Sequence, residues 1–118
     1  MKKRAIRCVV VSTTVDGETK ARRLAMLVVK ERLAACVQFA PIRSIYRWKG
    51  KIESASEYLL LAKTTLATAG RLAIFIRKHH DYELPEITVM PITGGLAGYL
   101  DWIGVETSSE KVSRGRVA

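Results

Sequence analysis

The pattern of apolar residues changes from short runs to helical spacing along the chain, which predicts alternating strands and helices. Ile6 to Val11 is a short run rich in β-branched residues, typical of a buried strand that ends at Ser12-Thr13-Thr14. A helix follows, with Asp16 as its N-cap and its end near Leu33. Its buried face is predicted at four positions with i, i+3, i+4, i+7 spacing: Ala21, Leu24, Ala25 and Val28.

The middle of the chain predicts a strand pair. Val37 to Trp48 is extended and interrupted at Pro41, which cannot donate a ladder hydrogen bond and so indicates an edge strand or a bulge. Lys49-Gly50-Lys51 is typical of a tight turn. The strand that follows is strongest from Glu57 to Lys63.

The second half repeats the order helix then strand. The spacing predicts a helix from Ala67 to about His79 and a strand from Glu86 to Ile92. A turn at Thr93-Gly94-Gly95 then leads into a last apolar segment, Tyr99 to Val105.

The order βαββαβ predicts an α+β fold of the ferredoxin-like, split βαβ type, with both helices on one face of an antiparallel sheet. The other face lacks helical cover, although its strands offer Val, Leu and Ile on both sides. We therefore expect oligomerisation through the sheet. The alternative is that Trp102 and the last segment fold over this face.

Composition indicates one ordinary globular domain, because the chain has 118 residues with 48% hydrophobic and 26% charged side chains. No apolar run approaches the ~20 residues that span a bilayer, and the basic start lacks the apolar run of a signal peptide. We expect a cytoplasmic protein without a membrane partner. Cys8 and Cys36 have no metal-type spacing and are expected to be buried, reduced thiols.

The net charge of +9 resides mostly in the chain ends. We divide the chain into a basic arm (1–5), a domain (6–106) and a basic tail (107–118) that is expected to be disordered. Residues 5–110 carry fourteen basic and eleven acidic side chains, so their net charge is only +3. RNA-recognition domains place aromatic residues on the first and third strands, but here only Tyr58 lies there, so no nucleic-acid partner is expected.

The densest polar stretch, His79 to Glu86, has residue types that bind metals. Its spacing matches no specific metal motif. The other interpretation of His79 is a helix-face histidine satisfied in the core or an interface, and that of His80 is a helix-end residue whose charged form favours the helix dipole. Glu83 and Glu86 are equally solvated loop charges.

Lys63 ends an apolar strand, so its ammonium either snorkels to the rim or meets an anion in a cleft between subunits. Neither cysteine has an evident nearby base and the chain has no nucleophile elbow, so we expect no enzymatic activity.

Five segments together closely resemble the CutA divalent-cation tolerance family and cover roughly residues 6 to 103. They are Glu31 to Val37, Ser44 to Ile52, Leu61 to Thr65, His80 to Ile87 and Tyr99 to Trp102. The resemblance implies a ferredoxin-like fold assembled as a homotrimer. It also implies a role in tolerance to divalent metals, copper especially, with no enzymatic activity and no organic cofactor.

By position, the resemblance places metal ligands at His80, His79 and Glu83. It places Lys63, Tyr82, Trp48 and Glu86 in a cleft between subunits. The trimer is similar to that of the nitrogen-signalling PII proteins, so the alternative function is a sensor that binds a small anionic ligand in this cleft.

The chain departs from the family pattern at two of its positions. Ser12 stands where some members have a copper-binding cysteine, which argues against a high-affinity soft-metal site. Asp81 replaces a usual proline, so it either loosens the turn or adds an oxygen ligand.

Overall fold

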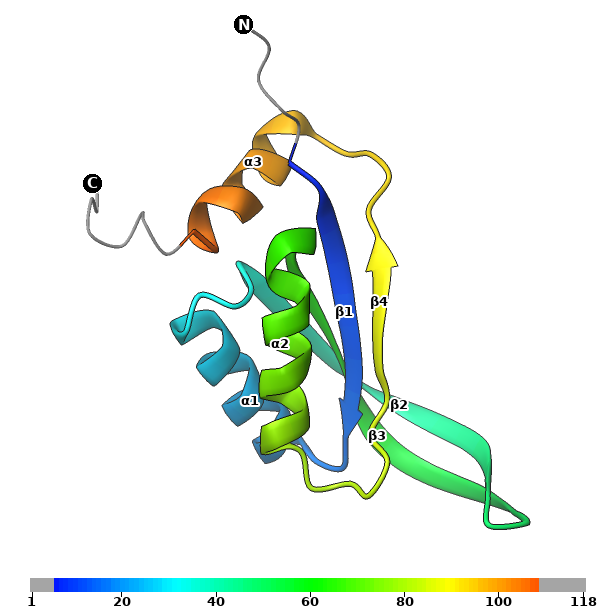
Figure 1. Cartoon of the computed structure of the whole chain (residues 1–118). Coiled ribbons are helices and arrows are strands. Elements are labelled where there is room, and N and C mark those ends of the chain that lie inside the picture. The colour runs from blue at the N-terminus through cyan, green and yellow to red at the C-terminus, as the bar shows by residue number, and fades with distance from the viewer. Residues whose placement is uncertain (1–5, 109–118) are drawn as a thin grey trace, which may run out of the picture.

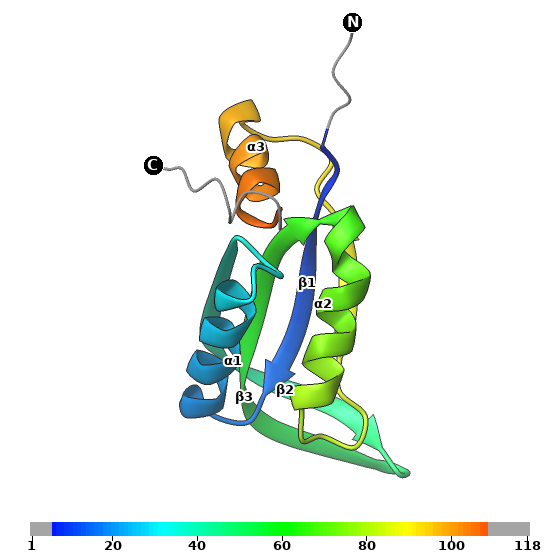
Figure 2. The same ribbon diagram turned by 60° about the vertical axis from the view of Figure 1, so that its left-hand side comes forward.

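The computed structural model, which describes residues 6–108, contains one sheet and three helices in the order βαββαβα (Figure 1). The elements are β1 (Cys8–Val15), α1 (Glu18–Lys30), β2 (Cys36–Trp48), β3 (Lys51–Thr65), α2 (Leu66–His79), β4 (Ile87–Pro91) and α3 (Ala97–Glu106). The strands form one antiparallel sheet of order β2-β3-β1-β4. Helices α1 and α2 lie side by side on one face of this sheet (Figure 2). The predicted α+β, ferredoxin-like fold is therefore confirmed.

The core lies between this helix pair and the sheet. Val9, Val11 and Val15 alternate along β1 and point toward the helices, because successive strand residues face opposite sides. Ala21, Leu24, Ala25 and Val28, the four positions predicted from helical spacing, are all buried on α1. Leu72 on α2 is fully buried in the same cluster.

The first strand is longer than predicted, because β1 continues through Ser12, Thr13 and Thr14 to Val15. These hydroxyl residues pair with Leu59 to Leu61 of β3 and are buried. Ladder hydrogen bonds and burial therefore override their turn preference. Asp16 is not the N-cap: Gly17 holds that position, and Asp16 pairs with Lys20 at 2.9 Å.

The last apolar segment is a helix, α3, at the end of the sheet where β1 begins (Figure 1). Ile103 is fully buried, and Arg32 Nη1 donates to the backbone oxygen of Glu106 at 2.7 Å. Trp102 remains 40% exposed, and the Tyr99 ring lies 6.0 Å from Nζ of Lys63 on the helix-free face. The segment therefore meets this face only at the end of the sheet where β1 begins (Figure 1).

The described range also bears on the predicted domain boundaries. Thr107 and Ser108 were placed in the tail, yet Thr107 is buried and its hydroxyl donates to the backbone oxygen of Ile103 at 2.8 Å. Thr107 therefore packs with α3, and the predicted division of the chain stays a prediction. The predicted basic arm (1–5) and residues 109–118 of the predicted tail lie outside the described residues.

The β2–β3 hairpin projects beyond the rest of the sheet (Figures 1 and 2). Strand β1 pairs with β3 only from Tyr58 to Thr65, so residues 51–57 pair with β2 alone. The turn uses positive φ at Lys49 and Gly50. Ile45 and Ile52 near its tip are 77% and 70% exposed.

Within residues 6–108, no helix has both the length and the apolar character needed to cross a membrane.

Leu72→Ala should lower the free energy of unfolding by about 2–5 kcal/mol, because it removes buried methyl groups and leaves a cavity. Urea denaturation measures this change. The matched control is Ile74→Ala on the same helix, where the side chain is 70% exposed and the expected change is within about 0.5 kcal/mol. Equal losses in the two variants would contradict the assigned core.

Candidate functional site

A cleft lies between the projecting hairpin and the segment that follows α2, residues 80–86, which we call the post-α2 segment. The lining residues come from β1, the hairpin and this segment: Thr14, Asp16, Ser44, Ile45, Tyr46, Trp48, Glu57, Tyr82, Glu83, Leu84 and Glu86. Its position therefore depends on how the post-α2 segment is held against β1.

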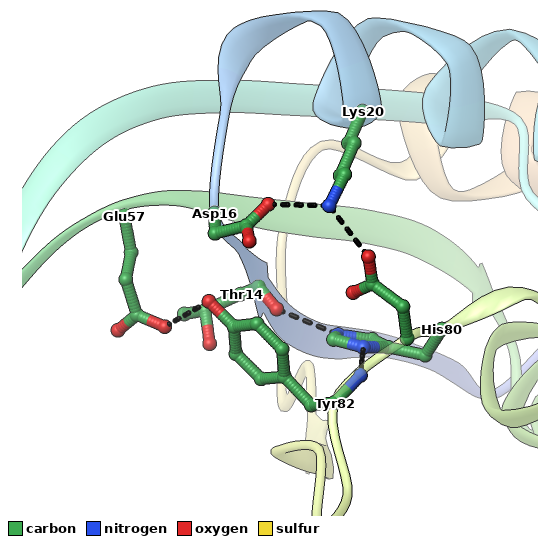
Figure 3. Close-up of polar contacts among 7 residues, drawn as sticks. Thr14, Asp16, Lys20, Glu57, His80 and Tyr82 are labelled. Atoms are coloured by element: carbon green, nitrogen blue, oxygen red, sulfur yellow. Dashed lines mark hydrogen bonds and ion pairs between the residues drawn. The ribbon is translucent and has the colours of Figure 1, made fainter.

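His80 fixes the start of this segment with both ring nitrogens (Figure 3). Nε2 lies 2.7 Å from the backbone oxygen of Thr14, and the backbone N–H of Tyr82 donates to Nδ1 at 3.1 Å. A carbonyl oxygen only accepts and a backbone N–H only donates, so the contacts select the neutral imidazole with its proton on Nε2. His80 thereby joins β1 to the post-α2 segment.

Tyr82 extends this connection to β3, since its hydroxyl donates to Oε2 of the buried Glu57 at 2.8 Å (Figure 3). Burial and the neighbouring Glu57 carboxylate raise the pKa of Tyr82 well above its ordinary value, because both disfavour the phenolate. Tyr82 therefore stays a hydrogen-bond donor throughout the physiological range.

Asp81 ties the same segment to α1. Its carboxylate contacts the ammonium of Lys20, which also pairs with Asp16 (Figure 3). The hydrogen bond from Lys20 lowers the pKa of Asp81, and the two carboxylates raise the pKa of Lys20. The departure from proline thus adds an ion pair at the surface. Asp81 is not among the residues that line the cleft, and both expectations for this position stay predictions.

The cleft is lined by negative charge. Four of its lining residues are carboxylates, Asp16, Glu57, Glu83 and Glu86, and none of the described residues that line it is Lys or Arg. Lys49 lies at its edge, with Nζ 3.8 Å from Glu83 Oε1 and 5.5 Å from the centre of the Trp48 ring. Carboxylates and aromatic faces both attract cations, so the cleft favours a cation over an anion.

The predicted metal ligands lie near one another in sequence but do not converge in one chain. Glu83 lines the cleft, whereas both nitrogens of His80 are used within the chain. His79 is on the last turn of α2, where Nδ1 donates to the backbone oxygen of Phe75 at 2.9 Å. Residues 6–108 contain no group of three or more His, Cys, Asp or Glu side chains that could hold a metal ion. The metal site therefore stays a prediction.

The structure separates Lys63 from the other predicted cleft residues. Trp48, Tyr82 and Glu86 line one cleft, as predicted from the resemblance. Lys63 does not line it: its ammonium donates to Gln38 Oε1 at 2.7 Å and lies 6.0 Å from the centre of the Tyr99 ring. A single chain thus does not place this lysine in the cleft.

Sequence reasoning missed Asp16 and Glu57 as cleft residues. Glu57 lies within β3 at the start of its apolar part, and its carboxylate lies on the helix-free face because it shares that face with Leu59. The two-residue period of a strand could have placed Glu57 on this face from the sequence alone. Ser12 lies in the same region, where its hydroxyl donates to Glu86 Oε2 at 3.4 Å.

Both cysteines are free thiols, as predicted. Cys8 is buried, and this burial raises its pKa. Cys36 is only partly buried, contrary to expectation, because it lies on the edge strand β2.

The fold and the acidic cleft define a small α+β protein suited to cations, and comparison with known proteins identifies its family. Residues 9–106 match the model of the CutA1 divalent ion tolerance protein family. The chain therefore belongs to this family of divalent ion tolerance proteins.

Two curated relatives show the extent of the likeness. The divalent-cation tolerance protein CutA of Thermus thermophilus is 44% identical over 99 residues, which are 83% of this chain and 96% of that protein. The chloroplastic protein CutA of Arabidopsis thaliana is 42% identical over 96 residues, 80% of this chain. These residues are 53% of the Arabidopsis protein, so the chain spans about half the length of the chloroplastic relatives it matches.

Solved structures agree with the fold. CutA from Synechococcus elongatus matches with a TM-score of 0.84 and 34% identity, covering 90% of this chain and 95% of that chain. The protein from Archaeoglobus fulgidus, described as a periplasmic divalent cation tolerance protein, matches with a TM-score of 0.84 and 33% identity, covering 86% of this chain and 99% of its own. These names place relatives in the chloroplast and the periplasm, so the cytoplasmic location stays a prediction.

Tyr82→Phe should reduce the free energy of unfolding by about 1–3 kcal/mol at neutral pH, because the variant leaves the buried Glu57 without its donor. The raised pKa gives this loss a pH dependence. Above pH ~10 the unfolded chain loses its tyrosine proton while the folded chain retains it, so the wild-type advantage should shrink as pH rises.

Urea denaturation at pH 8 and pH 10.5 measures this difference, with Tyr46→Phe as the control. Tyr46 lines the same cleft, is 44% exposed and forms no side-chain hydrogen bond within the described residues. A loss in Tyr82→Phe that is the same at both pH values would contradict the proposed role of the hydroxyl.

Proposed function

We propose that this protein binds divalent cations in its acidic cleft as part of divalent-cation tolerance, and that it does so as a homotrimer. The observation that carries the proposal is the concentration of four carboxylates in one cleft of a CutA1-family chain. Carboxylate oxygens are general ligands for divalent metals, and their combined charge raises the local concentration of cations.

Glu83 and Glu86 are the proposed oxygen ligands, since both lie on the post-α2 segment and line the cleft. His79 and His80 are the proposed nitrogen ligands, because imidazole suits Cu(II) and Zn(II). An imidazole binds a metal through the ring nitrogen that carries a lone pair and no proton. His80 would therefore bind through Nδ1, and the segment would have to release the N–H of Tyr82.

Two observations support the proposed trimer. One chain does not gather three ligands within residues 6–108, and a neighbouring chain would supply the remaining donors. The helix-free face also presents Leu59, Leu61 and the 43% exposed Met90 without helical cover. The projecting hairpin adds the exposed Ile45 and Ile52, and such apolar exposure favours contact with further copies.

The anionic-ligand alternative has less support. It relied on Lys63, which interacts with Gln38 and Tyr99 outside the cleft. A small anion in the cleft would meet Glu57, Glu83 and Glu86 without a lining cation. We therefore propose metal binding, in the cytoplasm, as the function.

Replacement of the proposed ligands should weaken binding of Cu(II) to the tag-free trimer. We expect His79→Ala/His80→Ala to lower affinity at least tenfold, equivalent to about 1.4 kcal/mol, and Glu83→Gln/Glu86→Gln to do the same. Native mass spectrometry with one equivalent of metal per chain and a mild competing chelator measures the metal retained.

Glu53→Gln is the matched control, since it removes one carboxylate from the hairpin without touching the cleft lining. A loss of affinity in Glu83→Gln/Glu86→Gln, with unchanged affinity in His79→Ala/His80→Ala, would assign the metal to the carboxylates alone. Unchanged affinity in both double variants would contradict the proposed site.

Ile45→Lys/Ile52→Lys should convert the trimer to a smaller species, because buried lysines at a subunit contact would carry uncompensated charge. Light scattering coupled to gel filtration measures the mass, which should be three times that of the chain for the wild type. The control Met26→Lys/Ile74→Lys adds the same charge to exposed positions of α1 and α2 and should remain trimeric. A monomeric wild type would reject the assembly.

A further inference from the structure

The two sheet-covering helices present the same pattern to solvent. On α1, Arg23, Met26 and Lys30 are spaced by three and then four residues. On α2, Arg71, Ile74 and Lys78 repeat this spacing. Residues at i, i+3 and i+7 lie on one side of a helix, so each helix exposes an apolar residue between two basic ones. We call these six residues the outer helix face.

The apolar residues at its centre are unusually exposed. Met26 is 69% exposed and Ile74 is 70% exposed, although both are large hydrophobic side chains. Helices α1 and α2 lie side by side on the same face of the sheet, so the two patterns belong to one surface (Figure 2). An apolar patch surrounded by polar groups is typical of an interaction site.

The charges around this patch are free to meet a partner. None of Arg23, Lys30, Arg71 and Lys78 forms an ion pair within residues 6–108, in contrast to Lys20 and Arg22 of α1. Together α1 and α2 carry seven basic residues and one acidic residue. The opposite charge gathers in the cleft, so the small net charge of the domain conceals two faces of opposite sign.

We propose that the outer helix face docks on the surface of a bilayer that contains anionic phospholipids. Basic side chains near such a surface each contribute a favourable interaction with the headgroups, and exposed apolar side chains enter the boundary between headgroups and acyl chains. The four basic residues would contact phosphates while Met26 and Ile74 insert.

A nucleic acid fits the surface less well, because a phosphate backbone offers no apolar partner to Met26 and Ile74.

The proposed docking on a bilayer is a surface contact and needs no spanning helix, so it revises the expectation of no membrane partner without requiring a membrane segment. It is also independent of the cleft and of trimer formation, since the proposed assembly uses the helix-free face and the hairpin.

The test is sedimentation of the full chain with vesicles of phosphatidylcholine alone or with about one third phosphatidylglycerol. The wild type should bind only the anionic vesicles, and binding should weaken as salt screens the charges. Arg23→Gln/Lys30→Gln/Arg71→Gln/Lys78→Gln should lose at least tenfold in vesicle partition. Met26→Ser/Ile74→Ser, which changes no charge, should lose about threefold or more.

The charge-matched control is Arg43→Gln/Arg47→Gln/Lys49→Gln/Lys51→Gln on the hairpin, which should bind as the wild type does. Circular dichroism verifies that each variant folds, and Arg71→Gln/Lys78→Gln serves as a milder variant. Retained binding in the helix-face charge variants would overturn the proposal and assign any binding to other basic residues. An unaffected Met26→Ser/Ile74→Ser variant, or tighter binding to duplex DNA than to vesicles, would also overturn it.

Discussion

The geometry of the site depends on one histidine that bonds at both ends of its ring. His80 donates to the backbone of β1 and accepts from the backbone of Tyr82, so a single side chain fixes where the chain goes after α2. Tyr82 can then reach Glu57, and Asp81 can reach Lys20. These contacts together hold the post-α2 segment against β1, α1 and β3, and this placement forms one wall of the cleft.

The charge distribution of the domain follows from its two-layer architecture. A two-layer fold gives the helices one outward face, and in this chain α1 and α2 carry seven of the fourteen basic residues between positions 5 and 110. The hairpin and the post-α2 segment enclose the carboxylates on another side. The electrostatic field of the domain is therefore divided between its layers, a property that the net charge of +3 for residues 5–110 does not reveal.

The helices and strands could be predicted from the sequence where hydrophobic periodicity was strong. The observed elements differ from the predicted ones where burial overrode the local preference of a residue. Ala21, Leu24, Ala25 and Val28 were predicted because helical spacing alone places them inward. The extension of β1 through Thr14 depends on pairing with β3, which no local pattern records. Glu57 and Asp16 joined the cleft for the same reason, since their proximity to Glu83 and Glu86 is created by tertiary structure.

Lys49 gives the cleft a competitor that is part of the chain. Its ammonium lies close to Glu83 and over the Trp48 ring, so an incoming cation meets a carboxylate that already has a positive neighbour. Both side chains of this pair are largely exposed, so the pair contributes about 0.2–1 kcal/mol and shifts affinity by less than about tenfold. If the cleft binds cations as proposed, the hairpin tip would set a shallow concentration threshold, below which Lys49 stays paired with Glu83 and above which free cations would take its place.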